Sequence, residues 1–198
     1  MTGEKRTKRR TIVHAVECVL LAGVLVAVGV LLRFGCTRYL RTAYPDDYRE
    51  AVCAAAQEYD LPPSLVFAVI RTESNFRPDV VSTAGAVGLM QVTEDTLDWA
   101  MMRTGGDRSL TANDLTDPEL NIRVGTAVLS LLGGMFEDED AVLAAYNAGM
   151  GNVRGWLADE RYSADGTSLK AIPFPETEQY VKRVRHAQKI YQKLYNLE

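Results

Sequence analysis

The sequence of 198 residues contains few of the cysteine and histidine residues that form disulfide scaffolds and metal sites. It contains three cysteines and two histidines, too few for a disulfide-stapled scaffold or a histidine metal site. Lys and Arg number 22 against 26 Asp and Glu, a formal net charge of −4. An acidic chain lacks the basic face of a general nucleic-acid-binding protein. We therefore predict no metal, no cofactor and no nucleic-acid partner.

The net charge is unevenly distributed along the chain. Residues 1–41 carry eight basic and two acidic residues, which gives +6, whereas residues 42–198 carry 14 basic and 24 acidic residues, which gives −10. The hydrophobic fraction of 47% and charged fraction of 24% are ordinary for a folded protein. They exclude a mostly disordered chain. The sequence therefore divides into a short basic segment and a longer acidic domain.

The basic segment contains an apolar run. Residues 18–32 are apolar without interruption, and extension to residues 12–34 includes His14, Glu17 and Arg33. A helix that crosses the hydrocarbon core of a bilayer needs about 20 residues, and long flanking side chains can reach the interface. We predict a basic tail over residues 1–11, a transmembrane anchor over 12–34, a linker over 35–44 and an outer domain over 45–198.

A cleaved signal peptide is the alternative to an anchor. Its basic start fits, but no small-x-small cleavage site follows the run. A lipoprotein would use Cys36, but Arg33 and Phe34 stand where small or aliphatic residues are needed. We predict a retained, single-pass anchor in the cell membrane. Five basic residues precede the run and three follow it closely, which predicts a cytoplasmic N-terminus and an extracytoplasmic outer domain.

The outer domain has the pattern of an all-α fold of about seven helices. Proline or acidic starts followed by 3,4-spaced apolar residues predict helices over residues 45–59, 62–75, 93–102, 117–134, 138–148 and 177–195. Gly85 to Gly88 and Gly149 to Gly151 are predicted to form tight loops. No segment alternates convincingly between apolar and polar residues, so we predict no sheet.

One carboxylate interrupts an apolar helix face. Glu73 lies four residues after Val69 and eight after Leu65, on the apolar stripe of its predicted helix. Such a carboxylate is paired, lies at the edge of a cleft, or stays neutral because burial disfavours its charge. The last case makes it a proton donor near neutral pH. Periodicity alone favours a capping or salt-bridging glutamate near a helix end, because it rests on a single residue.

Four short motifs change this balance. Residues 73–76 read ESNF, 82–91 read STAGAVGLMQ, 145–149 read AYNAG and 176–181 read ETEQYV. In this order they resemble the SLT-type lytic transglycosylases, and the resemblance covers about residues 47–196. It implies a lysozyme-like, goose-type helical fold after the anchor. It also implies an enzyme that cleaves the MurNAc-β-1,4-GlcNAc bond of peptidoglycan and leaves a 1,6-anhydro-MurNAc end.

The resemblance also implies roles for single residues. Glu73 would act first as general acid and then as general base, because the C6 hydroxyl of the substrate replaces the water and second carboxylate of ordinary glycosidases. Met90 would pack its thioether on a sugar, Gln91 would bind hydroxyl or acetamido groups, and Tyr146 would hydrogen-bond Glu73 or the N-acetyl group. The full set of predicted substrate-binding residues is Ser82, Gly88, Met90, Gln91, Tyr146, Asn147 and Tyr180.

Two other functions fit the same sequence. One is a lysozyme-like muramidase of the same fold, which uses water in place of the C6 hydroxyl. The other is a non-catalytic, membrane-tethered scaffold that binds peptidoglycan. In all three cases the predicted partners are glycan strands and, through the N-terminal helix, the membrane. The sequence indicates no protein partner and no biological process.

Overall fold

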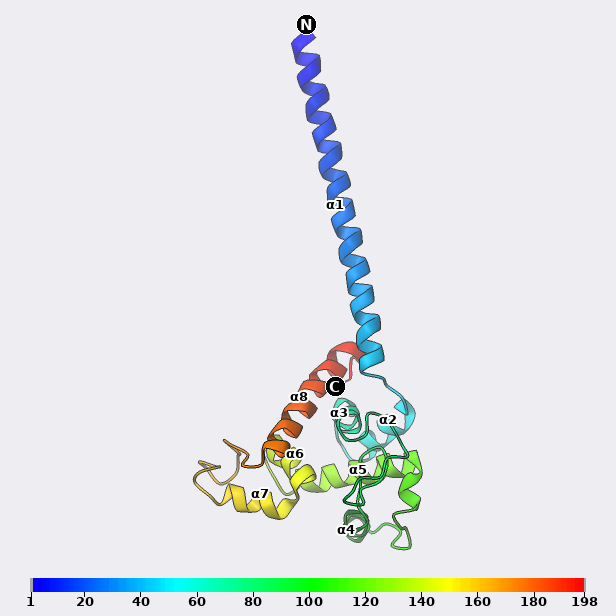
Figure 1. The fold of residues 1–198 in the computed structure, drawn as a ribbon, viewed down its shortest axis with the longest axis vertical. Helices are drawn as coiled ribbons and strands as arrows, with labels where there is room; N and C mark the ends of the chain where they lie inside the picture. Colours follow the sequence, from blue (N-terminus) through cyan, green and yellow to red (C-terminus); the bar gives the residue numbers. More distant parts are fainter. Residues whose placement is uncertain (1, 198) are drawn as a thin grey trace. The chain divides into compact units, whose positions relative to one another are not determined.

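The computed structural model describes residues 2–197, with the side chains of residue 14 and of residues 20–197. The chain divides into two compact units, with the boundary between Ala43 and Tyr44 (Figure 1). The first unit is one helix, and the second contains the remaining helices. This division separates the basic segment from the acidic domain at nearly the position where the charge changes sign.

The first unit is the helix α1 (Thr2–Ala43). Within it, Leu20–Ala43 is long and apolar enough to cross a membrane, by length and composition alone. Side chains from residue 20 to residue 36 are all exposed in this unit. The predicted anchor over 12–34 overlaps this stretch from residue 20. The side chains of the predicted anchor before residue 20, except that of His14, are outside the described part of the chain. The side chains of the basic tail are outside it as well.

The helix continues through residues 35–43, which the sequence assigned to a linker. No proline occurs before Pro45, so nothing removes a helical hydrogen bond in this stretch. Tyr44 precedes that proline, and steric clash with a following proline ring disfavours the helical conformation. The helix therefore ends at Ala43 and not at the end of the apolar run.

The second unit is helical, as expected. Among described residues, strand-like pairing is limited to isolated bridges, such as Val81 with Val87, and the all-α prediction is confirmed. The elements are α2 (Arg49–Glu58), α3 (Pro63–Glu73), α4 (Glu94–Thr104), the 3-10 turn η1 (Asp114–Thr116), α5 (Pro118–Gly133), α6 (Glu139–Ala148), α7 (Met150–Leu157) and α8 (Pro175–Tyr195).

Two boundaries differ from the sequence prediction. Helix α2 begins at Arg49 and not near Pro45, because Tyr48 takes a left-handed conformation with φ of 60°. The predicted tight loop at Gly149 to Gly151 is wrong. Within that segment only Gly149 has a positive φ, of 87°, and α7 begins at the next residue. A single glycine is enough to turn the chain, because it adopts positive φ without a steric cost.

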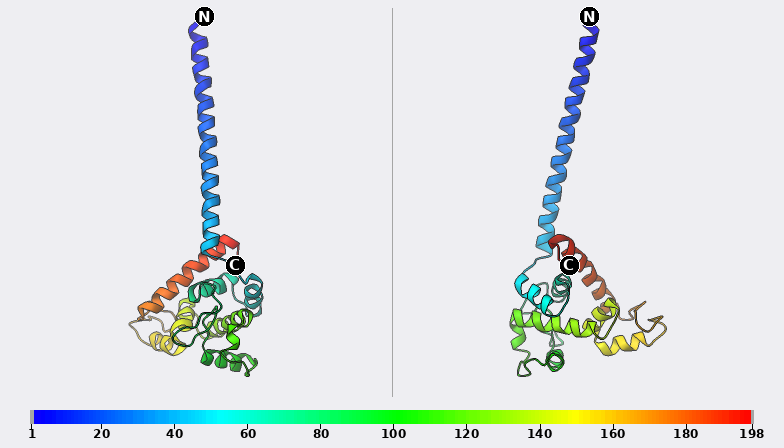
Figure 2. Two further views of the ribbon diagram at one scale, coloured as in Figure 1. Left: turned by 45° about the vertical axis from the view of Figure 1, so that its right-hand side comes forward. Right: turned by 180° about the vertical axis from the view of Figure 1, so that it is seen from behind.

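Helix packing brings α3 and α8 together (Figures 1 and 2). Helix α5 contacts α2, α4 and α6, while α3 and α8 form the most extensive helix pair. The ring of Phe67 in α3 stacks on that of Tyr191 in α8, with centroids 5.2 Å apart. The hydroxyl of Tyr191 also donates to the carbonyl of Pro45 at 2.8 Å. These contacts hold the late part of α8 against the middle of α3.

Candidate active site

Glu73 is the last residue of α3 and is partly buried. Burial raises the pKa of its carboxyl from the ordinary 4.5 to about 7, against smaller lowering effects from the Tyr180 hydroxyl and the Arg183 charge. Among the described residues, Glu73 makes no ion pair within 4.0 Å. A carboxyl in this state holds its proton through a large part of the neutral range and can donate it.

Two tyrosines from different helices surround this carboxyl. Tyr180, near the start of α8, is 2% exposed, and its hydroxyl lies close enough to Glu73 to lower the carboxyl pKa. That contact falls short of a well-formed hydrogen bond, and the Tyr180 hydroxyl forms none with any other described residue. Burial first, and the Glu73 charge second, raise the pKa of Tyr180 and Tyr146 well above the usual value. Both hydroxyls therefore remain neutral.

The loop over residues 82–91 is held by side chains from three segments. The Ser74 hydroxyl, next to Glu73, donates to the Leu89 carbonyl at 2.8 Å. The Met90 amide donates to Asn121 Oδ1 in α5 at 2.8 Å, and the Met90 carbonyl accepts from the Tyr146 hydroxyl in α6 at 2.8 Å. These three bonds fix the loop relative to Glu73.

Asn121 is a buried positioning residue that sequence reasoning missed. Its side chain is 0% exposed, and its Nδ2 donates to the carbonyls of Val87 and Leu115 at 2.9 Å each. Together with the bond from Met90, the amide is fully used, as a buried polar group must be. An amide within the apolar stretch of a predicted helix is the signal that could have found it.

Gly88 is required by packing in this loop. Its φ is +77°, and an added Cβ would lie 2.4 Å from Asn121 Nδ2 and 2.8 Å from the Leu115 carbonyl oxygen. Any other residue would displace the amide that holds the loop. The predicted approach of a sugar to Gly88 remains a proposal beside this structural role.

Three other residues predicted to bind substrate have hydrogen-bonding groups that remain available. Gln91 Nε2 donates to the carbonyls of Val80 and Gly88 at 3.1 and 3.0 Å, which leaves its Oε1 as an acceptor. The Ser82 hydroxyl accepts from the Ala86 amide at 3.0 Å and can still donate. Asn147 Oδ1 accepts from the Thr177 hydroxyl at 2.8 Å, so its amide nitrogen remains available.

The structure corrects the prediction for Met90. Its side chain is 0% exposed, and its sulfur would lie 2.6 Å from a Cβ added to Gly125 in α5. The thioether therefore packs in the core, in space left by a glycine, which contradicts the predicted contact with a sugar. Met90 acts at the site through its backbone. Its neighbour Leu89 is also 0% exposed.

Arg183 is a second residue that sequence reasoning missed. It is exposed, like most of the basic residues of α8. It lies one turn after Tyr180, and its charge acts on Glu73. The sequence could not single it out, because basic residues occur all around α8.

Comparison with known families identifies the class of the second unit. The family described as "Transglycosylase SLT domain" matches residues 50–168, and the chain belongs to this family. The soluble lytic murein transglycosylase of Escherichia coli (strain K12) is 34% identical over 148 residues, 74% of this chain and 23% of the relative. The membrane-bound lytic murein transglycosylase C of Serratia proteamaculans (strain 568) is 33% identical over 167 residues, 74% of this chain and 47% of the relative.

Solved structures share the fold. An inactive glutamate-to-glutamine mutant of the lytic transglycosylase Slt from Pseudomonas aeruginosa matches with a TM-score of 0.70 and 36% identity, over 79% of this chain and 26% of that one. The 70 kDa soluble lytic transglycosylase of Escherichia coli matches with the same TM-score and 29% identity, over 79% of this chain and 26% of that one. The chain spans about a quarter to a half of the length of the curated relatives it matches.

The apolar stretch of α1 fits membrane anchoring, since Leu20–Ala43 is long and apolar enough to cross a membrane. Some of the matched relatives are named membrane-bound lytic murein transglycosylase C.

Proposed function

We propose that the protein is a lytic transglycosylase that cleaves the MurNAc-β-1,4-GlcNAc bond of peptidoglycan and forms 1,6-anhydro-MurNAc. The observation that carries this proposal is Glu73, a desolvated carboxyl with a pKa of about 7 between two neutral tyrosines. It lies in a domain of the SLT family, whose relatives here are named lytic murein transglycosylases.

The reaction needs one carboxyl because the nucleophile belongs to the substrate. Protonated Glu73 donates its proton to the glycosidic oxygen while the bond from that oxygen to C1 breaks. The C6 hydroxyl oxygen of the same muramyl residue then bonds to C1, and the Glu73 carboxylate takes the hydroxyl proton. No water is consumed, and Glu73 ends protonated as it began.

The neighbouring groups are assigned to orientation and binding. Tyr180 stays neutral beside Glu73, so its hydroxyl can orient the carboxyl without adding charge. Tyr146 is also neutral and donates its hydroxyl proton to the Met90 carbonyl. The free Oε1 of Gln91, the hydroxyl of Ser82 and the amide nitrogen of Asn147 are assigned to sugar hydroxyl and acetamido groups. The backbone at Gly88 completes the proposed set.

The proposed topology is a single-pass membrane protein with a cytoplasmic N-terminus and an extracytoplasmic catalytic unit. The uneven basic residues around the apolar run support this orientation. Protease added to intact spheroplasts should digest the catalytic unit. A tag at the N-terminus should be cleaved only after lysis, and its loss from intact spheroplasts would reverse the orientation.

Product analysis tests the proposed reaction. The full chain in detergent is incubated with purified peptidoglycan, and soluble fragments are identified by mass spectrometry. We expect muropeptides with anhydro ends, which weigh one water less than hydrolysis products. Reducing ends in their place would identify the muramidase alternative. Binding to sacculi without release of fragments would identify the scaffold.

A further inference from the structure

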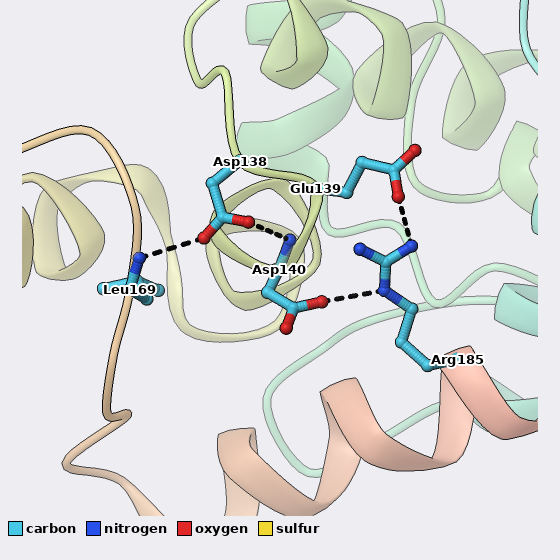
Figure 3. Close-up of polar contacts among 5 residues, drawn as sticks. All are labelled: Asp138, Glu139, Asp140, Leu169 and Arg185. Atoms are coloured by element: carbon cyan, nitrogen blue, oxygen red, sulfur yellow. Dashed lines mark hydrogen bonds and ion pairs between the residues drawn. The ribbon is translucent and has the colours of Figure 1, made fainter.

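Helix α8 carries two arginines on either side of its buried stripe. At about 100° per residue, Arg183 and Arg185 point to different flanks. Arg185 donates from Nε to Asp140 at 2.7 Å and from Nη1 to Glu139, so its charge is paired with two carboxylates (Figure 3). Among described residues, Arg183 makes no ion pair within 4.0 Å. The stripe that separates them consists of Tyr180, Val184, Ala187 and Tyr191.

The flank that carries Arg183 is the one that faces Glu73. Tyr180 lies one turn earlier and contacts the carboxyl, and a residue three positions later lies on the same side of a helix. Arg183 is exposed, whereas Glu73 is partly buried. Among the described residues, the two side chains form no ion pair within 4.0 Å, and the positive charge of Arg183 still lowers the Glu73 pKa. A solvent-facing cation without a carboxylate partner lies beside the proposed acid.

We propose that Arg183 binds a carboxylate carried by the muramyl residue of the substrate, and is thereby a specificity-determining residue. This inference rests on the proposed function. A guanidinium offers a planar fork of donors that fits a carboxylate bidentately. Muramyl residues present carboxylates in two forms. Where the stem peptide is attached, its free carboxylates are available, and where the peptide has been removed, the lactyl carboxylate is exposed.

Binding of such a carboxylate also favours the chemistry at Glu73. The positive charge of Arg183 lowers the pKa of the free Glu73 carboxyl, which opposes the role of a general acid. A substrate carboxylate bound to Arg183 offsets this positive charge. The offset raises the Glu73 pKa, so the enzyme holds the catalytic proton more firmly when an anionic substrate is bound.

Three substrates and four proteins test the inference. The substrates are peptide-bearing strands, the same strands with all carboxylates amidated, and strands stripped of peptide by an amidase. The proteins are the full-length wild type, Arg183→Gln, Arg183→Lys and the matched control Lys182→Gln. Lys182 is exposed, pairs with Glu178 at 2.6 Å and lies on another face of α8. Release of anhydro-muramyl product gives kcat and KM over a range of pH.

On peptide-bearing strands we expect Arg183→Gln to lose about tenfold in kcat/KM, mainly through KM, since a charge-assisted hydrogen bond has about this effect. Arg183→Lys should recover part of the loss, and Lys182→Gln should match wild type. On amidated strands, at a pH below the alkaline limb, wild type and Arg183→Gln should be equal. A loss on peptide-bearing strands that vanishes on stripped strands would place the ligand on the stem peptide. A loss only on stripped strands would identify the lactyl carboxylate, and a loss on both would mean that Arg183 accepts either carboxylate.

The pH profile separates this role from a structural one. Loss of the Arg183 charge should move the alkaline limb of kcat/KM to higher pH, because that charge lowers the free Glu73 pKa. Unchanged thermal unfolding of Arg183→Gln would show that the fold is intact. An equal loss on amidated strands, or no loss on any strand, would overturn the inference. If wild type releases no anhydro product from any strand, the proposed function itself fails.

Discussion

The second unit contains two contrasting groups of carboxylates. Glu73 is partly buried without an ion pair, and its pKa rises to about 7. In the run from Asp138 to Asp140, Glu139 is exposed, the two aspartates are partly exposed, and all three side chains have partners. Asp138 accepts from the backbone amides of Asp140 and Leu169, at 3.2 and 3.0 Å, and Arg185 binds Glu139 and Asp140 (Figure 3).

This difference shows which acidic residues carry chemistry. In the sequence, the acidic run is conspicuous and Glu73 is a single residue on an apolar stripe. In the structure, Asp138 caps helix α6 and accepts the Leu169 amide, and Glu139 and Asp140 pair with Arg185. Burial of Glu73, in contrast, disfavours its charged form. Desolvation without a close cation leaves a carboxyl ready to exchange a proton near neutral pH, while exposed ion pairs add little to stability.

Activity should separate the two groups most strongly. We expect Glu73→Gln to lower the rate of anhydro-product release by about 10²–10⁴-fold, the usual contribution of a general acid. Glu139→Gln should stay within about twofold of wild type, because its side chain is 72% exposed and belongs to the surface cluster. Initial rates on purified peptidoglycan measure both variants. Comparable losses in the two would show that the acidic run belongs to the reaction.

The second largest expected effect is on how the free energy of unfolding depends on pH. The native carboxyl of Glu73 has a pKa of about 7 against 4.5, so folded protein binds this proton more tightly than unfolded chain. Its stabilising contribution is full below about pH 4.5 and is lost as pH rises through about 7, by up to about 3 kcal/mol. Glu73→Gln cannot ionise, so it should equal wild type near pH 4 and be more stable near pH 8.

Urea unfolding at several pH values measures this effect, and Glu58→Gln is its control. The Glu58 pKa is lowered, first by hydrogen bonds from Arg123, so its contribution has the opposite sign and is lost as pH falls. If Glu73→Gln had the same stability difference from wild type at every pH, Glu73 would not be the group that titrates.

The cap of α6 should have a smaller effect. Asp138 caps this helix and accepts the Leu169 amide, so Asp138→Ala should lower the free energy of unfolding by about 1 kcal/mol. Asp138→Asn, which can still accept, should lose less. Equal losses in the two variants would assign the effect to charge and not to the cap. Urea unfolding at one pH is sufficient.

The ion pairs of Arg185 should have the smallest effect. Arg185→Ala should cost less than about 1 kcal/mol of unfolding free energy, because its carboxylate partners are largely exposed. The difference should shrink further in high salt. Product release should stay within about twofold of wild type. A tenfold loss of activity would mean that this cluster positions α6 and α8 at the site.

The sequence predicts the helices of the second unit better than the side-chain positions in its loops. The 3,4 spacing of apolar residues identified α3 and α5, and the spacing of Glu73 from Val69 placed the acid on its helix. In the loop over residues 82–91 there is no period, so nothing local tells which side chains face the core. Met90 was therefore assigned to the substrate although it is fully buried. Helix α7 was missed because Gly149 and Gly151 resemble a loop.

Local patterns in the sequence establish the helical character of the second unit, the apolar stretch in α1 and the motifs typical of the family. These depend on local periodicity, on caps and on runs of one residue type. Which polar groups come into contact depends on how the helices pack. Asn121 holds the loop, Arg185 is paired and, among the described residues, Arg183 has no ion-pair partner, although both arginines lie on one helix. Desolvation and charge pairing depend on distances between elements far apart in the chain, and those exist only after the helices have packed.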